Sequence, residues 1–168
     1  MVGGVKSLTE SEIRRSVVNG SRKAVASIVL PQAFPDLVWD SLDYLAWRDP
    51  RAPQRGYVVG WRDERPVGVI LRKADSSGVR ARASLCQLCQ SLHSTDDVSL
   101  FSARRAGQAG RDFNTVGTLI CSELVCSRNV RILPPPEPLR PDPHAVVADR
   151  IAGLVLRTDA FIDSVLRG

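Results

Sequence analysis

The chain has only four cysteines, and they form two pairs: Cys86 and Cys89 in the segment CQLC, and Cys121 and Cys126 in CSELVC. A thiolate is a soft ligand, and four thiolates around one Zn²⁺ ion make a closed tetrahedral site. No cysteine is left over, which favours a structural zinc site over two alternatives, four unrelated buried thiols or a redox pair. His93 follows the first pair and could replace one sulfur, although a solvated histidine is the simpler interpretation.

The elements expected around the two pairs indicate the kind of zinc site. The CxxC step forms a tight knuckle, whereas Cys121 is expected at a strand end and Cys126 in the first turn of a helix. A knuckle, a hairpin and a helix-borne pair are the parts of a treble clef. Four thiolates leave no open position for water, which disfavours a catalytic zinc. The sequence also lacks P-loop, G-x-S-x-G and H-E-x-x-H motifs, so we expect no enzyme and no small-molecule substrate.

Residues 1–50 are predicted to form an N-terminal helical segment. Thr9 and Glu12 have the spacing of a capping box, which marks the start of a first helix. The residues NGS end that helix, and a second short helix runs towards Leu30. The stretch VWDSLDYLAW has Val38, Leu42 and Leu45 at helical spacing, and it predicts a third helix.

Residues 51–133 are predicted to hold the β-hairpins and the treble clef. The β-branched runs GYVVGW and PVGVILR, joined by RDER, indicate a hairpin. VRARAS predicts a third strand with Arg80 and Arg82 on one face, and VSLFSA predicts a fourth. A Pro-rich linker follows at 134–144, and residues 145–168 predict an amphipathic helix that docks on the core. The predicted class is α+β: an antiparallel sheet with a treble-clef zinc finger, flanked by N- and C-terminal helices.

Composition and charge limit the range of partners. With 168 residues, of which 43% are apolar, the chain is long enough for one domain with a real core. The formal net charge is +5, and nearly all the positive charge is arginine, which binds carboxylates and phosphates in a bidentate manner. An acidic partner is one explanation of this bias, and the codon usage of a GC-rich genome is the other. The sequence shows no secretory signal and no membrane-spanning run, which predicts a cytoplasmic protein without a membrane partner. The aromatic residues expected to anchor the core are Trp39, Trp47 and Trp61.

Four segments together resemble one known family: WDSLDYLAWRDPRAPQRGYVV, CQLC, ARRAGQAGRDFNTVGTLIC and CSELVC. They look like the FBP-type treble-clef domain, over roughly Trp39 to Arg131. That domain forms the C-terminal half of the elongation-factor-G-binding, fusidic-acid-resistance proteins of the FusB type. The resemblance implies that the four cysteines carry zinc, and that the domain binds elongation factor G and helps it leave a ribosome stalled by fusidic acid.

Two features differ from the family pattern. The resistance proteins have an N-terminal helical bundle before this domain, whereas a shorter segment precedes it here. Leu119 stands where an aromatic residue is often found, two positions before the third cysteine. If that aromatic residue belongs to the binding surface of the family, the contact with the elongation factor differs in this protein.

Two binding functions are therefore considered. The first is binding of the acidic elongation factor G, and the second is direct binding of the ribosome or its RNA by a hibernation or recruitment factor. A zinc-thiolate cluster lowers the net charge of +5 by two, which is modest for an RNA-binding protein. Two orientations remain open for Phe113: outward as a binding anchor, or inward over the zinc knuckle. The candidate partner-binding residues are Arg104, Arg105, Arg111, Phe113, Arg128 and Arg131.

Overall fold

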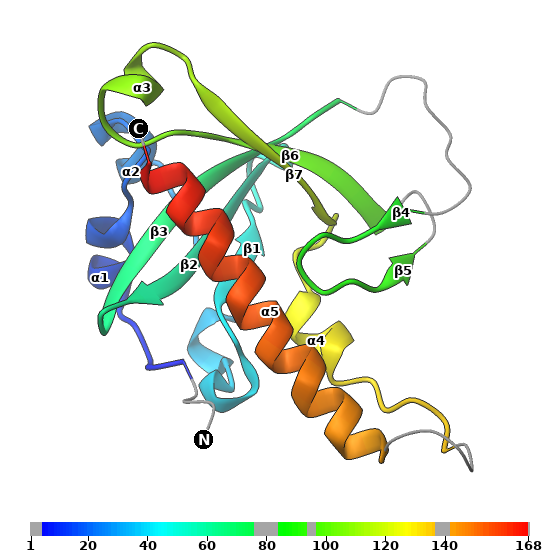
Figure 1. Ribbon diagram of the computed structural model, residues 1–168. Coiled ribbons are helices and arrows are strands. Elements are labelled where there is room, and N and C mark those ends of the chain that lie inside the picture. Colours follow the sequence, from blue (N-terminus) through cyan, green and yellow to red (C-terminus); the bar gives the residue numbers. More distant parts are fainter. Residues whose placement is uncertain (1–4, 76–83, 94–96, 137–141, 168) are drawn as a thin grey trace.

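A five-stranded antiparallel sheet with helices on both faces organises the protein (Figure 1). The computed structural model describes residues 5–75, 84–93, 97–136 and 142–167. In sheet order, the strands are β1 Leu45–Arg48, β2 Arg55–Arg62, β3 Arg65–Lys73, β6 Val98–Arg104 and β7 Thr115–Cys121. A separate two-stranded ribbon is formed by β4 Ser84–Leu85 and β5 Leu92–His93. The predicted α+β class with an antiparallel sheet is confirmed.

The β2–β3 hairpin forms where the sequence predicts it. Asp63 and Glu64 connect the two strands, and both have positive φ angles, 47° and 62°. Two consecutive residues in the left-handed region are typical of a type I′ turn, whose twist matches that of the flanking strands. The segment VSLFSA lies in β6, also as predicted. The predicted strand with Arg80 and Arg82 lies outside the described residues.

The ladder between β3 and β6 is short, and one asparagine extends the connection. Within the described ranges, two residue pairs are in register, Arg72 with Ser102 and Lys73 with Phe101. Farther along, the side chain of Asn19 bridges the strands. Its Oδ1 accepts from the backbone N–H of Ile70 at 2.8 Å, and its Nδ2 donates to the carbonyls of Ile70 and Arg104, both at 3.0 Å. The loop that leaves α1 is thereby fixed to the middle of the sheet.

The N-terminal segment is less helical than predicted. Two short α-helices form, α1 Glu10–Ser16 with the predicted capping box and α2 Arg22–Ala26. The third predicted helix, over Val38–Trp47, is wrong. This stretch instead follows a 3₁₀ turn at Phe34–Asp36 with a second 3₁₀ turn at Trp39–Ser41, and it then enters β1.

The error has a physical cause. Leu45 and Trp47 are two residues apart and both are buried, which is the period of a strand. In β1 they lie opposite Val59 and Tyr57 of β2, and the Trp47 and Tyr57 rings are 4.7 Å apart. Pairing with β2 therefore outweighs the weak local preference for a helix. Of the three tryptophans, Trp47 is buried, whereas Trp39 and Trp61 are only partly buried.

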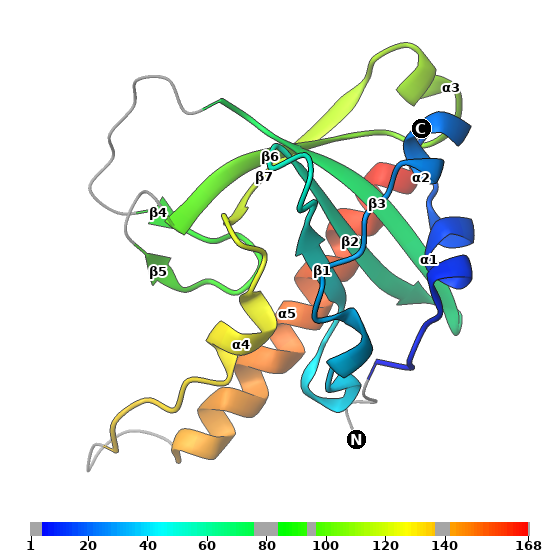
Figure 2. The same ribbon diagram turned by 180° about the vertical axis from the view of Figure 1, so that it is seen from behind.

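The two faces of the sheet are covered by different elements. The N-terminal segment packs on one face, where Ile13 of α1 meets Leu45, Tyr57 and Val59 (Figure 2). The long helix α5, Pro143–Leu166, crosses the other face (Figure 1). It begins two residues before the predicted boundary, because Pro143 is at the first helical position, which proline favours. None of the helices in the described ranges is long and apolar enough to cross a membrane.

The apolar side of α5 is buried in the larger core cluster. Leu154, Ile162 and Val165 are completely buried, and Phe161 is 7% exposed. Burial of such side chains contributes roughly 1.5–3 kcal/mol each. The approach is close, since a Cβ atom on Gly60 of β2 would lie 2.4 Å from Cδ1 of Ile162.

Polar contacts hold α5 along its length. Near its middle, Arg157 Nε donates to the carbonyl of Leu88 at 2.6 Å, next to the cysteine knuckle. Near its end, Arg105 Nη1 donates to the carbonyls of Ser164 and Arg167, both at 2.5 Å. Helix ends leave such carbonyls without helical partners, so Arg105 caps α5 from the β6–β7 loop.

Candidate metal centre

The first cysteine pair lies in a tight turn between β4 and β5. The carbonyl of Cys86 accepts from the N–H of Gln90 at 2.8 Å, and the N–H of Cys86 donates to the carbonyl of Ser91 at 3.2 Å. Gln90 has a φ of 58°, which lets the chain reverse direction. The N–H of Cys89 also points at Sγ of Cys86, at 3.4 Å. The turn therefore brings both sulfurs of the CxxC segment to one side.

The second pair joins a strand to a helix. Cys121 is the last residue of β7, and Cys126 is the first residue of α4, Cys126–Val130. Between them, the N–H of Leu124 donates to the carbonyl of Cys121 at 2.9 Å, and Leu124 has a φ of 58°. This turn reverses the chain within five residues. The predicted strand-end and helix-start positions of these two cysteines are confirmed.

Gln87 fastens the knuckle to β7. Its backbone N–H donates to the carbonyl of Leu119 at 2.7 Å, and its Oε1 accepts from the N–H of Leu119 at 3.1 Å. The hydroxyl of Thr118 donates to the same Oε1 at 2.9 Å. Gln87 thus binds the free edge of β7 and holds the first cysteine pair next to the second.

The four sulfurs form one compact, buried cluster. All four Sγ atoms lie within 4.8 Å of one another, with 3.6 Å between Cys86 and Cys126 and 3.6 Å between Cys89 and Cys121. A disulfide has its sulfurs about 2.05 Å apart, so these are free thiols. Zinc–sulfur bonds of about 2.3 Å in a tetrahedron place sulfurs about 3.8 Å apart. The spacing of the sulfurs therefore suits a tetrahedrally coordinated ion of the size of zinc.

The electrostatics of the cluster also favour a cation. Hydrogen bonds from the Cys121 and Cys126 thiols lower the pKa of Cys86 to about 6. Hydrogen bonds with Cys121, Cys86 and Cys89 raise the pKa of Cys126 far above its usual range. At these distances the ionisation of one thiol opposes the ionisation of its neighbours. A divalent cation removes this competition, because it stabilises four thiolates at once.

Three donors surround the sulfurs. Asn129 Nδ2 lies 3.4 Å from Sγ of Cys121, and the N–H of Cys89 lies 3.4 Å from Sγ of Cys86. Tyr44 is 2% exposed, and its hydroxyl is buried without an oxygen or nitrogen partner. Tyr44 belongs to the same buried cluster as the four cysteines, and burial, followed by the charge of Cys126, raises the pKa of Tyr44 well above its usual value. Donors such as the two N–H groups at 3.4 Å stabilise metal-bound thiolates.

The profile of one protein family, the FBP C-terminal treble-clef zinc-finger, matches residues 12–165. The chain belongs to this family. The match extends beyond the Trp39–Arg131 region in which the sequence resemblance was seen, and it includes most of α5. No curated protein and no solved structure matches the chain.

Within this FBP-family domain, the arginine-rich loop lies far from the cysteine cluster. In the β6–β7 hairpin, Val98 is opposite Cys121, whereas Arg104 is opposite Thr115. Six residues of strand separate the two ends, a distance of about 20 Å. The loop, which contains the short helix α3 Gly107–Arg111, therefore lies at the opposite end of the hairpin (Figure 1). The candidate partner-binding residues of this loop, Arg104, Arg105, Arg111 and Phe113, are therefore not beside the cysteines.

The candidate partner-binding residues have different surroundings. Phe113 is 72% exposed, with the guanidinium of Arg104 over its ring at 4.7 Å, so of its two orientations the outward one is observed. Arg111 is exposed and donates to Gln108 at 2.9 Å. Arg105 is used inside the protein as the cap of α5.

The two arginines of α4 also differ. Arg128 is exposed. Arg131 instead forms two hydrogen bonds to the carboxylate of Asp43, at 2.6 and 3.0 Å, and the side chain of Asp43 is only 2% exposed. A third bond, to the carbonyl of Ser127, completes its contacts at 2.8 Å. Arg131 therefore connects α4 to the start of β1, which the sequence alone did not indicate.

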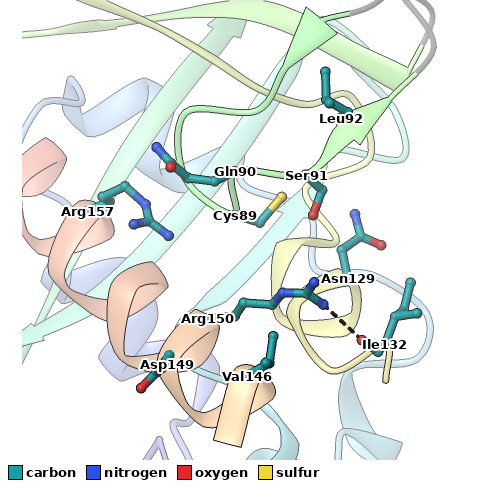
Figure 3. A pocket seen from close by; sticks show the side chains of 10 residues that line it. All are labelled: Cys89, Gln90, Ser91, Leu92, Asn129, Ile132, Val146, Asp149, Arg150 and Arg157. Atoms are coloured by element: carbon teal, nitrogen blue, oxygen red, sulfur yellow. Dashed lines mark hydrogen bonds between the residues drawn. The ribbon is translucent and has the colours of Figure 1, made fainter. Parts of the chain in front are cut away.

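A cleft of about 720 Å³ lies beside the cluster, between Cys89 and the first turns of α5 (Figure 3). Its two arginines are already bonded to the protein, Arg150 to the carbonyl of Ile132 at 3.0 Å and Arg157 to the carbonyl of Leu88. Arg157 thereby holds α5 against the knuckle, and Arg150 holds it against the segment that follows α4.

The sequence missed three residues that support the cluster: Tyr44, Gln87 and Asn129. Gln87 is recognisable only by its place inside CQLC, and Asn129 by its place one helical turn after Cys126. Tyr44 is more than forty positions from the nearest cysteine, and no sequence signal connects it to the site. The side chain of His93, the other candidate ligand, lies outside the described residues.

Proposed function

We propose that the protein is a zinc-stabilised binding module of translation that associates with elongation factor G and has no catalytic activity of its own. The observation that carries this proposal is the closed cluster of four cysteines in a chain of the FBP C-terminal family. The ion is zinc, because four thiolates in a tetrahedron are its typical structural site and occupy every position in its coordination sphere. Metal chemistry on a substrate would need an open position.

The association with the elongation factor comes from the family resemblance and from charge. FusB-type proteins use this domain type to bind elongation factor G and to promote its release from a ribosome stalled by fusidic acid. The chain is basic, with a formal net charge of +5 before the cluster is counted. An acidic elongation factor is a complementary partner, since opposite charges speed association and fix the orientation of the partners. Fusidic acid protection is the proposed cellular consequence, in the cytoplasm.

One observation supports a second function, direct binding of ribosomal RNA. Phe113 is exposed and carries the Arg104 guanidinium on its ring, an arrangement on which an unpaired base can stack. RNA binding of this kind depends strongly on salt and needs no elongation factor.

The test measures binding of the purified, zinc-loaded protein to elongation factor G and, separately, to 70S ribosomes freed of the factor. We expect a saturable complex with elongation factor G, and faster recovery of translation in a fusidic-acid-inhibited extract. If only the ribosomes bind, with an affinity that falls steeply between 50 and 200 mM salt, the second function replaces the first. A well-folded sample with far less than one zinc ion per chain would contradict the metal assignment.

A further inference from the structure

One part of the sheet is uncovered on the face that carries α1. Side chains of directly paired residues point to the same face of a sheet. Arg55, Arg72 and Ser102 are paired in sequence across β2, β3 and β6, so all three lie on one face. Tyr57, two residues after Arg55, lies on this face in the core cluster that Ile13 of α1 completes. The face is therefore the one covered by the N-terminal segment.

The N-terminal segment covers only the β1–β3 part of this face. In Figure 2, α1 and α2 lie beside β3; the tip of the β6–β7 hairpin, with α3, lies above α2, and the rest of the hairpin extends away from these helices towards β4. Along β7, Thr115, Gly117 and Leu119 are exposed, whereas Thr118 and Ile120, whose side chains point to the α5 side, are buried. On this side the N-terminal segment reaches the hairpin through the bond from Asn19 to the carbonyl of Arg104, and the middle of the hairpin is left exposed to solvent.

Large apolar side chains of the uncovered area are exposed to solvent. Leu100 and Leu119 are directly opposite each other in the β6–β7 ladder, and they are 47% and 38% exposed. Phe113, at the far end of the hairpin, is 72% exposed. Large apolar side chains grouped on one exposed surface are typical of a binding site.

Arginines stand among these apolar groups. Arg72 and Arg104 are both exposed, and within the described residues neither forms a salt bridge. Arg104 lies over the ring of Phe113. Arg55 is partly buried beside Arg72 and donates to Ser27 at 3.0 Å. The surface therefore combines positive charge with apolar contact area, and aromatic residues and arginines are the residue types most enriched in binding hot spots.

We propose that this surface, which we call the open sheet face, is the docking site for an acidic protein surface, and that its residues are Arg72, Leu100, Arg104, Phe113 and Leu119. The inference rests on the proposed function, in which that partner is elongation factor G. A protein partner fits better than RNA, because two of the three apolar residues are leucines, on which bases do not stack, and only one is aromatic. Apolar side chains and carboxylates of a protein would match both parts of the face.

The experiment compares variants of the full chain for binding to purified elongation factor G. The first variant reverses charge on the face, Arg72→Glu with Arg104→Glu, and the second removes its apolar pair, Leu100→Thr with Leu119→Thr. A control with the same change in net charge carries Arg22→Glu and Arg65→Glu, two exposed arginines elsewhere. Each variant must retain the zinc content and melting temperature of the wild type, as expected for exposed positions.

We expect both face variants to raise Kd by about tenfold or more, and the control to stay within about twofold to threefold of the wild type. Wild-type affinity in both face variants would overturn the docking site and leave the proposed function standing. Absence of binding by the wild type would overturn the proposed function itself. If the face variants lose binding to poly-uridine RNA or to ribosomes and keep elongation factor G, the acidic protein partner is wrong.

Discussion

Arg131 was a candidate partner-binding residue in the sequence, and the structure makes it part of the frame that holds α4. We predict that Arg131→Ala destabilises the protein. The substitution leaves the carboxylate of Asp43, 2% exposed, without the two hydrogen bonds it accepts at 2.6 and 3.0 Å. Removing one partner of a buried ion pair costs about 3–5 kcal/mol. Because the side chain of Arg131 is itself 30% exposed, water can reach the vacated site, and we expect the lower end, about 3 kcal/mol.

A loss of this size should lower the melting temperature by about 6–12 °C, given roughly 2–4 °C per kcal/mol for a protein of this length. The measurement is urea and thermal unfolding of the zinc-loaded protein, together with its Kd for elongation factor G. Arg128→Ala, on the exposed side of the same helix, is the control and should change stability by less than about 0.5 kcal/mol.

A double-mutant cycle makes the test sharper. Asp43→Asn removes the buried charge, so Arg131→Ala should cost less in that background than in the wild type. The reasoning is refuted if Arg131→Ala unfolds at the wild-type midpoint and binds elongation factor G more weakly, because Arg131 would then belong to the interface and not to the fold.

Three further predictions concern the metal, the α5 contact and alkaline pH. Cys86→Ser should lose zinc and most of its tertiary structure, since zinc binding to thiolate sites contributes about 10–16 kcal/mol, more than the usual net stability of a domain; elemental analysis and near-UV circular dichroism measure this. Gly60→Val should cost about 1–3 kcal/mol in urea unfolding, because its Cβ would lie 2.4 Å from Ile162, whereas Gly117→Ala, with its nearest neighbour at 3.5 Å, should have little effect. Tyr57 has its pKa raised to about 12 by burial and by its hydrogen bond to a carboxylate. Its contribution is therefore complete below pH 10 and is lost between about pH 10 and 12, and Tyr57→Phe should flatten this part of the stability–pH curve.

Local elements are well predicted where a few neighbouring residues determine them. The turn between Arg62 and Arg65 reads directly from RDER, and the helix at Cys126 follows from the treble-clef spacing. The predicted cysteine cluster forms because two short turns, at Gln90 and Leu124, are local features of each pair. Such features depend on a few neighbouring residues and can therefore be recognised in the sequence.

Long-range features were harder to predict. The stretch from Val38 to Trp47 has apolar residues that satisfy a helical period, and only its partner β2 decides that its end becomes a strand. The pairing of Arg131 with Asp43 joins residues 88 positions apart. The distance between the arginine loop and the cysteines depends on the length of β7, which has seven residues. The ends of this strand are not marked in the sequence. Whether an arginine is solvated or paired depends on the residues that surround it in the folded protein, and the amino-acid composition does not show this.

The position of α5 in the chain has a consequence for how the protein is made on the ribosome. Leu154, Phe161, Ile162 and Val165 complete the larger core cluster, yet α5 is the last of the described elements to be synthesised. All four metal ligands emerge before it, so the cysteine cluster can take up its ion while one face of the sheet is still bare. Until α5 has been synthesised, this face of the sheet exposes apolar side chains, among them Val58, Val69 and Leu71. Exposed apolar surface of this kind promotes aggregation and is recognised by chaperones. The four cysteines are thus synthesised before α5, and α5 completes this core cluster.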